Sequence, residues 1–498
     1  MAAFLDVCRF NPTLGGTTDW TFSTAVQGYQ TPTLAGASNG RVYKYRAESA
    51  DLSQWELGEG AYSSGTGVFA RTTVLYNSSG TGTAPGQSGV GSKISFSTVP
   101  QVAIVALKED LVSIEEANAF TVAQQAQTRS NIAASGLAAM AMKNAIVNAA
   151  MDVSQELAGQ VTLVNNTGRY TADQWIAIYN HTAATAVVVS SRFSIASLGV
   201  PLVGFQFCHL IQATTAISSP ASGDFACHRQ FVEGYRVAHW GWGATGAAAI
   251  SVAFQFYSTV SGTAFVRLSN GATANRFYYH EITVAAGLWN FYSFVVPGDT
   301  SGTWAKDNTR ALTIEVFGSG KETTPQASLD GWGATAKLQT TNSTNLLGTA
   351  NNATLLTGMY VDANGGQLPS AAELPLVMRP FDHELQICQR YWCKSYDYTV
   401  YAGDTSIVGA LSAVSTYAAA GNSFWIATYP FPVRMCKTPT VTVYATNSGT
   451  ANRIREFVTP TDRTIDSLNV SNAGALVYTT QFNYGQPGAC HLICDARL

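Results

Sequence analysis

The stretch Ile250-Ser251-Val252-Ala253-Phe254-Gln255-Phe256-Tyr257 decides the fold class of this chain. It lies inside a longer uncharged run, from Trp240 to Val266, which raises the question of a membrane span. Within the stretch, large apolar side chains recur at every second position. A period of two is typical of a β-strand with one buried face. We therefore expect a half-buried strand here and no membrane insertion.

The same alternation recurs on both sides of this strand. It is visible in Val203-Phe205-Phe207, in Ile282-Val284 and in Leu312-Ile314-Val316, with Gly- and Asn-rich turns between them. Many short alternating strands without a helical period predict a β-sandwich, because each strand turns one apolar face toward the opposite sheet. We assign this sandwich to residues 161–380.

Two further β-rich regions flank the sandwich. Residues 1–108 are rich in Gly, Thr and Ser, with short alternating runs between turn clusters, which predicts a small β-domain. Residues 381–498 begin with a short helical segment and continue as apolar strands, which predicts a second sandwich. The expected fold class is therefore mainly β: a small N-terminal β-domain, a connector, and two distal β-sandwich domains of jelly-roll type.

The connector, residues 109–160, differs in composition from both neighbours. It is rich in Ala, Gln, Glu, Asn and Met and contains no Pro, which predicts helix. A narrow stripe with a polar Asn at a core-type position is typical of a coiled coil, so we expect self-association; the alternative is a helix packed on its own domain. The residues of this stripe, at spacings of three and four, are Leu137, Met140, Asn144, Val147 and Met151.

Composition limits the function of the chain. Lys and Arg number 28 and Asp and Glu 31, so that 12% of the 498 residues are charged, against about 25% in globular domains. Nucleic-acid binding depends on clustered Lys and Arg and is not expected. A surface of Ser, Thr, Asn, Gln and Gly suits neutral sugars or other hydroxyl-rich surfaces. The N-terminus shows no cationic segment before an apolar run, so no signal peptide is visible.

Catalytic and metal-binding patterns are weak. Because nothing in the sequence brings two carboxylates into one cleft, we expect no enzyme, no cofactor and no metal. Eight cysteines, three of them in Cys-His dipeptides, are expected to be buried free thiols; disulfides and a structural zinc are the alternatives. The carboxylates considered for a glycosidase pair are Asp299, Asp307, Glu315, Asp382 and Glu384.

Aromatic side chains are the remaining signal for binding. An exposed ring offers a flat apolar platform with a polar tip to the face of a sugar. Along a strand, only alternate members of an aromatic run point outward. The candidate carbohydrate-binding residues are Trp240, Trp242, Tyr278, His280 and Trp425.

Short strings in a fixed order along the chain point to a family. They are Trp55–Tyr62, Arg71–Leu75, Gly91–Ile94, Ser113–Thr121, Ala123–Ile132, Gly168–Trp175, Val232–Tyr235, Pro297–Trp304, Arg379–Phe381, Cys388–Trp392, Phe431–Met435, Pro439–Thr442 and Asp495–Leu498. In this order they resemble the tail-fibre or receptor-binding proteins of tailed bacteriophages and prophages, including the carbohydrate-binding-module-like β-sandwich of these proteins.

The resemblance implies a homotrimeric, non-enzymatic protein of the virion tail, made in the cytoplasm of the bacterial host. Residues 1–108 would anchor it to a tail or baseplate protein, residues 109–160 would form the trimerisation connector, and the distal domains would bind a host surface polysaccharide. Two alternatives stay open. One is a structural virion fibre, such as a collar, head or tail spacer. The other is a polysaccharide depolymerase spike, in which Asp299, Asp307 and Glu315 would act together.

Overall fold

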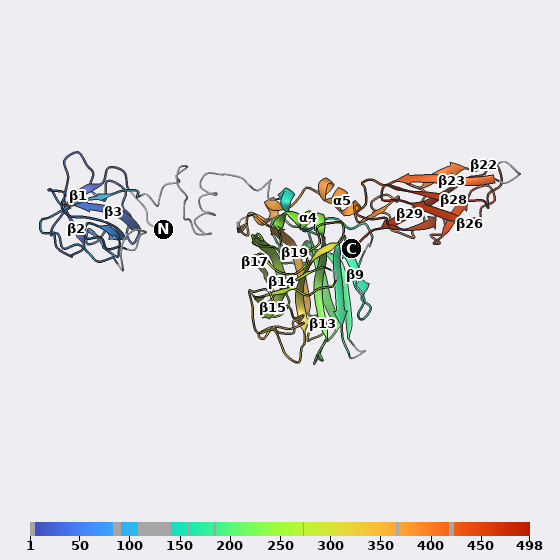
Figure 1. Cartoon of the computed structure of the whole chain (residues 1–498), viewed down its shortest axis with the longest axis horizontal. Helices are drawn as coiled ribbons and strands as arrows, with labels where there is room; N and C mark the ends of the chain where they lie inside the picture. Colours follow the sequence, from blue (N-terminus) through green and yellow to red (C-terminus); the bar gives the residue numbers. More distant parts are fainter. Residues whose placement is uncertain are drawn as a thin grey trace. The chain divides into compact units, whose positions relative to one another are not determined.

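The computed structural model describes residues 5–82, 91–107, 141–156, 159–182, 186–271, 273–364, 366, 368–417 and 423–498. The fold is mainly β, with 43% strand and 6% helix, which confirms the expected class. Contacts divide the chain into two units, Met1–Phe120 and Thr121–Leu498 (Figure 1). Among the described residues, no helix is long and apolar enough to cross a membrane.

The N-terminal unit is a small closed β-sheet. Its antiparallel strands are β1 (Arg9–Pro12), β2 (Trp20–Ala25), β3 (Val42–Glu48), β4 (Trp55–Ser63), β5 (Val68–Phe69), β6 (Thr73–Asn77) and β7 (Gln101–Ile104). They follow the order β3-β7-β1-β2-β5-β4-β6, and β3 also pairs with β4, so the sheet closes on itself. Strand β4 alternates between buried and half-buried side chains, the period of two that its sequence predicts.

A buried ion pair ties the strands of this barrel together. The Nε and Nη2 atoms of Arg71 lie 2.8 and 2.5 Å from the carboxylate of Glu56, and neither side chain is exposed. Tyr45 Oη and the Ile94 amide also donate to this carboxylate, at 2.7 Å each. The guanidinium lies 4.2 Å from the ring of Trp20. The pair therefore connects β4 with β2, with β3 and with the segment that contains Ile94.

The second unit begins with a sandwich of two six-stranded antiparallel sheets. One sheet has the order β16-β15-β18-β13-β10-β9, and the other β17-β14-β19-β12-β11-β8. The strands of the first are β9 (Arg169–Ala172), β10 (Trp175–Asn180), β13 (Phe225–Glu233), β15 (Gly262–Asn270), β16 (Phe277–Val284) and β18 (Arg310–Gly320). The strands of the second are β8 (Val161–Thr162), β11 (Val187–Ser194), β12 (Phe207–Thr215), β14 (Ile250–Ser258), β17 (Trp289–Val296) and β19 (Ala353–Asp362).

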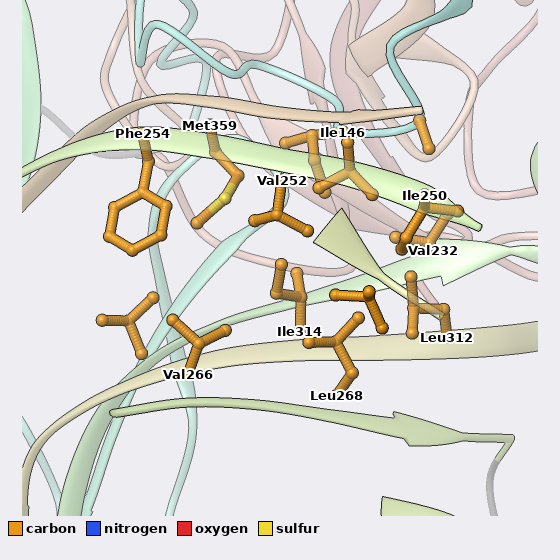
Figure 2. Close-up of a cluster of buried hydrophobic side chains, with 14 of the residues drawn as sticks. Ile146, Val232, Ile250, Val252, Phe254, Val266, Leu268, Leu312, Ile314 and Met359 are labelled. Atoms are coloured by element: carbon orange, nitrogen blue, oxygen red, sulfur yellow. The ribbon is translucent and has the colours of Figure 1, made fainter. Parts of the chain in front are cut away.

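The apolar faces of the two sheets form the main core. Figure 2 shows Val252 and Phe254 of β14 facing Val266 of β15 and Ile314 of β18. The expected strand is therefore present, but the expectation that it is half-buried is wrong. All nine residues of β14 are buried, because its other face packs in a second cluster under the short helix η3 (Leu374–Val377).

The C-terminal part of this unit is a second pair of sheets. It follows the helix α5 (Phe381–Gln389). One sheet joins β20 (Trp392–Lys394), β21 (Leu411–Val414), β24 (Thr440–Ala445), β25 (Arg453–Glu456) and β26 (Asp462–Thr464) around β29 (Pro487–Asp495). The other has the order β22 (Thr416–Tyr417), β23 (Ser423–Pro430), β28 (Gly474–Thr479) and β27 (Ser467–Val470). Both sheets contribute to one core, in agreement with a sandwich.

The segment before the sandwich corrects the predicted coiled-coil stripe. Leu137 and Met140 lie outside the described residues, and helix in the described part ends at residue 143. Asn144, Val147 and Met151 are buried in the chain's own cores. The Asn144 amide donates to the Met359 carbonyl at 3.0 Å, and its oxygen accepts two main-chain amides. These three residues therefore pack within one chain and are not available for a stripe between chains.

Candidate functional site

The two tryptophans predicted as sugar platforms are buried. Trp240 and Trp242 are 1% and 4% exposed. Trp242 packs edge-on against Trp304, with ring centroids 4.5 Å apart, and lies 5.2 Å from Trp332. The predicted role is therefore wrong for both. Trp240 ends the short helix η2 (Ala238–Trp240), and Trp242 follows it in a loop, so the alternation expected of a strand does not apply to them.

The other predicted aromatics are also engaged inside the fold. Tyr278 is buried and donates a hydrogen bond to Asp330, and Trp425 is buried and donates to the Ala413 carbonyl. Their predicted role as platforms is wrong. His280 is half-buried: it stacks on Phe294 and its Nδ1 lies 2.6 Å from Asp330. Of the five predicted residues, only His280 keeps part of its ring at the surface.

Four of the five carboxylates considered for catalysis have structural partners. Glu315 is bound by Arg229 and Arg267 at 2.7 Å each; burial opposes its ionisation, but the two guanidinium groups hold its pKa below the usual range. In the remaining cases the carboxylates serve ion pairs or turns, or lie at the surface: Asp299 binds Arg276, Asp307 binds the Thr309 amide, Glu384 binds Arg379, and Asp382 is exposed.

A cleft of about 420 Å³ opens where the sandwich meets the C-terminal part of the same unit. Three of its lining side chains are aromatic and three are polar. They come from β11, β12, α5, the loop after β20 and the segment before β8. The lining residues are Asp152, Arg192, Gln206, Phe207, Phe381 and Tyr398.

The register of β11 and β12 builds one wall of the cleft. Arg192 pairs with His209, and Ser194 pairs with Phe207, so Arg192 and Phe207 lie two positions apart on the same face of the sheet. The Arg192 guanidinium lies 3.9 Å from the centroid of the Phe207 ring. Its Nη1 atom donates to the main-chain oxygen of Asp152 at 3.1 Å. The stacking and the hydrogen bond together fix the orientation of this side chain.

Two further lining residues come from the C-terminal part. Phe381, the first residue of α5, is 45% exposed and meets the Tyr398 ring edge-on at 5.6 Å. Tyr398 Oη accepts the Ser154 amide at 3.0 Å. The buried ammonium of Lys394 donates to the carbonyl oxygens of Gln155, Tyr398 and Val400 at 2.7–2.9 Å. Tyr398 is therefore held at its hydroxyl and at its main chain, while Phe381 stays partly accessible.

The polar groups of the cleft have unused hydrogen-bonding capacity. Within the described ranges, the Asp152 carboxylate, the Gln206 amide and the Nε and Nη2 atoms of Arg192 have no partner. Burial raises the pKa of Asp152, the nearby charge of Glu384 raises it further, and Arg192 lowers it in part. Unpaired donors and acceptors that converge in a cleft with aromatic walls are typical of a ligand site.

None of the six lining residues was among the residues predicted from the sequence. Asp152 falls in the segment expected to be helical, and Tyr398 lies in a turn-rich stretch without a motif. Phe381 ends one of the family-like strings, which was the single sequence signal in this region. The others come together only because β11, β12 and α5 pack at one end of the sandwich.

The cysteines and the candidate metal ligands can be assessed from the structure. All eight cysteines are buried free thiols, and burial raises the pKa of Cys8 and of Cys436 to about 11. Within the part of the chain that the structure describes, no group of three or more His, Cys, Asp or Glu residues has the geometry of a metal site.

Comparisons with known proteins give low similarities. No family model and no curated protein matches. The enzymatically active domain of tailspike protein 4 of bacteriophage CBA120 is similar at a TM-score of 0.24 and 10% identity, over 45% of this chain and 22% of that one. TmCBM61 in complex with β-1,4-galactotriose is similar at a TM-score of 0.22 and 9% identity, over 44% of this chain and 99% of that one.

A third solved structure is the family 11 carbohydrate-binding module of the Clostridium thermocellum cellulase Lic26A-Cel5E. Its TM-score is 0.21 at 11% identity, over 43% of this chain and 99% of that one. The match to the tailspike therefore spans about a fifth of that protein's length, whereas the matches to the two modules span nearly all of theirs. These low scores establish neither a family nor a function.

Proposed function

We propose that this chain is a carbohydrate-binding adhesin, the receptor-binding fibre of a tailed bacteriophage or prophage, which attaches the virion to a host surface glycan. The observation that carries the proposal is the cleft, which is lined by three aromatic rings and by three polar side chains with free hydrogen-bonding atoms. A sugar ring has apolar C–H faces and hydroxyl edges. Phe381 and Tyr398 suit such a face, and Asp152, Arg192 and Gln206 suit the hydroxyls.

The role is adhesion without cleavage. Glycoside hydrolysis commonly needs two carboxyl groups roughly 5 to 9.5 Å apart across the scissile bond, and the lining of this cleft contains one, Asp152. The three carboxylates of the depolymerase alternative are used elsewhere: Glu315 and Asp299 in ion pairs and Asp307 in a turn.

Assembly in the virion follows from the family-like strings. Residues 1–108 are the anchor to a tail or baseplate protein, and residues 109–140 are the remaining part of the proposed trimerisation connector. In a homotrimer, three weak clefts act together through effective concentration, so single-site contacts in the millimolar range still hold a virion reversibly. The low charge of the chain, 12% of its residues, makes this attachment tolerant of salt.

The proposal is tested with the purified full-length chain on intact bacterial cells and on an array of bacterial polysaccharides, while light scattering gives its mass. Saturable binding that is lost after the cell polysaccharide is stripped, at a mass near three chains, is expected. Phe381→Ala removes an exposed ring from the cleft and should weaken binding; Phe457→Ala, at a position of similar exposure outside the cleft, should not. A folded trimer that binds neither cells nor polysaccharides would refute the proposal and favour the structural fibre.

A further inference from the structure

We infer that the saccharide bound in the cleft carries a carboxylate, and that this carboxylate lies against the Nε–Nη2 edge of Arg192. The inference rests on the proposed function and narrows it to one class of ligand, acidic sugars such as uronic or nonulosonic acids. The neutral surface of the rest of the chain leaves this class open, because one well-placed guanidinium is enough to select it.

The orientation of Arg192 leaves one particular edge free. Its Nη1 atom is taken by the Asp152 carbonyl, and its face is stacked on Phe207. The Nε and Nη2 atoms remain, and among the described residues nothing binds them. These two N–H groups are parallel and match the two oxygens of a carboxylate, so they accept such a group in a bidentate fork. A hydroxyl would use only one of the two.

The chain itself uses this edge for carboxylates. In five other arginines, Nε and Nη2 bind the two oxygens of one carboxylate at 2.5–3.1 Å. Arg192 is the one arginine of the cleft lining, and there the same edge is open to a ligand. The five internal pairs are Arg71–Glu56, Arg276–Asp299, Arg379–Glu384, Arg390–Glu233 and Arg497–Asp495.

Asp152 adds a dependence on pH to this site. Its carboxyl lies in the same cleft without a partner among the described residues, so the carboxylate of the ligand meets electrostatic repulsion while Asp152 is ionised. The charged groups around it are Glu384, which Arg379 binds, and Arg192 itself; the neutral Tyr398 hydroxyl also faces this segment. Burial and Glu384 already raise the pKa of Asp152. Protonation of Asp152 removes the repulsion and supplies an O–H donor, so acidic sugars bind more tightly as the pH falls.

The other lining residues can contact the hydroxyl groups and the apolar face of the sugar. Gln206 is exposed and offers a donor and an acceptor to hydroxyl groups. The rings of Phe381, on α5, and of Tyr398, in the loop after β20, line the same cleft as Arg192 and Phe207. An acidic sugar therefore finds one charged contact, several neutral hydrogen bonds and an apolar face in one cleft.

Matched pairs of probes test the inference on the wild-type full-length chain. The probes are trisaccharides of galacturonic, glucuronic and mannuronic acid and N-acetylneuraminic acid, each compared with its methyl ester, which removes the charge and blocks one oxygen of the fork with a methyl group. By isothermal titration calorimetry, at least one acid should bind about tenfold more tightly than its ester. If no acid binds more tightly than its ester, the inference is wrong. Binding of neutral glycans on the polysaccharide array would then leave the proposed function standing.

Variants locate the contact. Arg192→Lys keeps the positive charge but loses the fork, so the preference for acid over ester should fall to about twofold, while ester binding stays nearly unchanged. Asp152→Asn should remove the rise in acid affinity between neutral and mildly acidic pH. Circular dichroism and the mass by light scattering show that each variant is folded. An unchanged acid preference in folded Arg192→Lys would overturn the assignment of the contact to this residue.

Discussion

Two histidines between the sheets of the sandwich make the chain sensitive to acid. The Nδ1 atoms of His209 and His228 lie 2.8 Å apart, and both residues are fully buried. The Nε2 atom of His209 is 2.7 Å from the Thr171 hydroxyl, and that of His228 is 3.0 Å from the Thr354 hydroxyl. When both rings are neutral, one Nδ1 carries a proton and donates a hydrogen bond to the other Nδ1. Protonation of the second Nδ1 would place a positive charge in the buried core.

The loss of folding stability in acid follows from the pKa values of the two histidines. Burial lowers the pKa of His209 to about 3 from its ordinary 6.5; burial, and then the charge of His209, lower the pKa of His228. Both folded values lie below the unfolded one, so the unfolded chain binds more protons and stability is lost as the pH falls below about 6.5. At about pH 5 each unfolded histidine gains about 2 kcal/mol from protonation, so the pair costs about 4 kcal/mol relative to about pH 7.5.

Urea unfolding of the full-length chain at several pH values measures this loss. Tryptophan fluorescence is a suitable signal, because the Trp175 ring lies 6.1 Å from that of His209. In the double variant His209→Gln/His228→Gln, the amides keep hydrogen bonds to the two threonines but do not titrate. It should lose about 4 kcal/mol less than the wild type between the two pH values. His239→Gln, at an exposed position, is the control. Equal losses in the double variant and the wild type would refute this account.

Three further predictions concern the buried ion pair of the N-terminal unit, the Lys394 ammonium and the buried thiols. Glu56→Gln leaves the Arg71 guanidinium buried without its counter-ion and should lower the unfolding free energy by about 3–5 kcal/mol in calorimetry; a value as small as that of Asp6→Asn, at the surface, would contradict this. Lys394→Met leaves three carbonyls without a donor, including that of Tyr398, and should cost about 3 kcal/mol. It should also weaken sugar binding by calorimetry, and unchanged affinity would show that this ammonium does not position the cleft. The eight thiols should resist a thiol reagent in the native chain and all react in denaturant; a fast-reacting native thiol would contradict their burial.

Local pattern was enough to predict most of the architecture. The alternation from Ile250 to Tyr257 falls in β14, and that from Leu312 to Val316 in β18. What local pattern missed is the burial of both faces of β14. The second face of β14 is buried by η3, residues 374–377, which lies more than a hundred positions later in the sequence. The spacing of apolar residues within β14 therefore does not indicate that this face is buried.

The connector shows why spacing alone misled. Asn144, Val147 and Met151 have the spacing of a coiled-coil seam, but each side chain finds a partner in a distant part of the chain. Asn144 binds the main chain of β19, where its amide nitrogen donates to Met359 O and its oxygen accepts the Val361 amide. Such tertiary contacts override helical preference. Likewise the cleft combines residues as far apart as Asp152 and Tyr398, a combination that no sequence motif contains.

The few charges of the chain explain why the cleft stands out. A buried charge costs several kcal/mol unless it is paired and hydrogen-bonded, and some buried charges of this chain are paired closely: Arg71 with Glu56, and Glu315 with two arginines. Arg192 and Asp152 contact each other only through a main-chain oxygen, although their side chains line the same cleft. Two neighbouring opposite charges that do not pair are stable only while solvent or a ligand satisfies them. A polar ligand with a carboxylate for Arg192 and hydroxyls for Asp152 would replace that solvent, as we propose for this cleft.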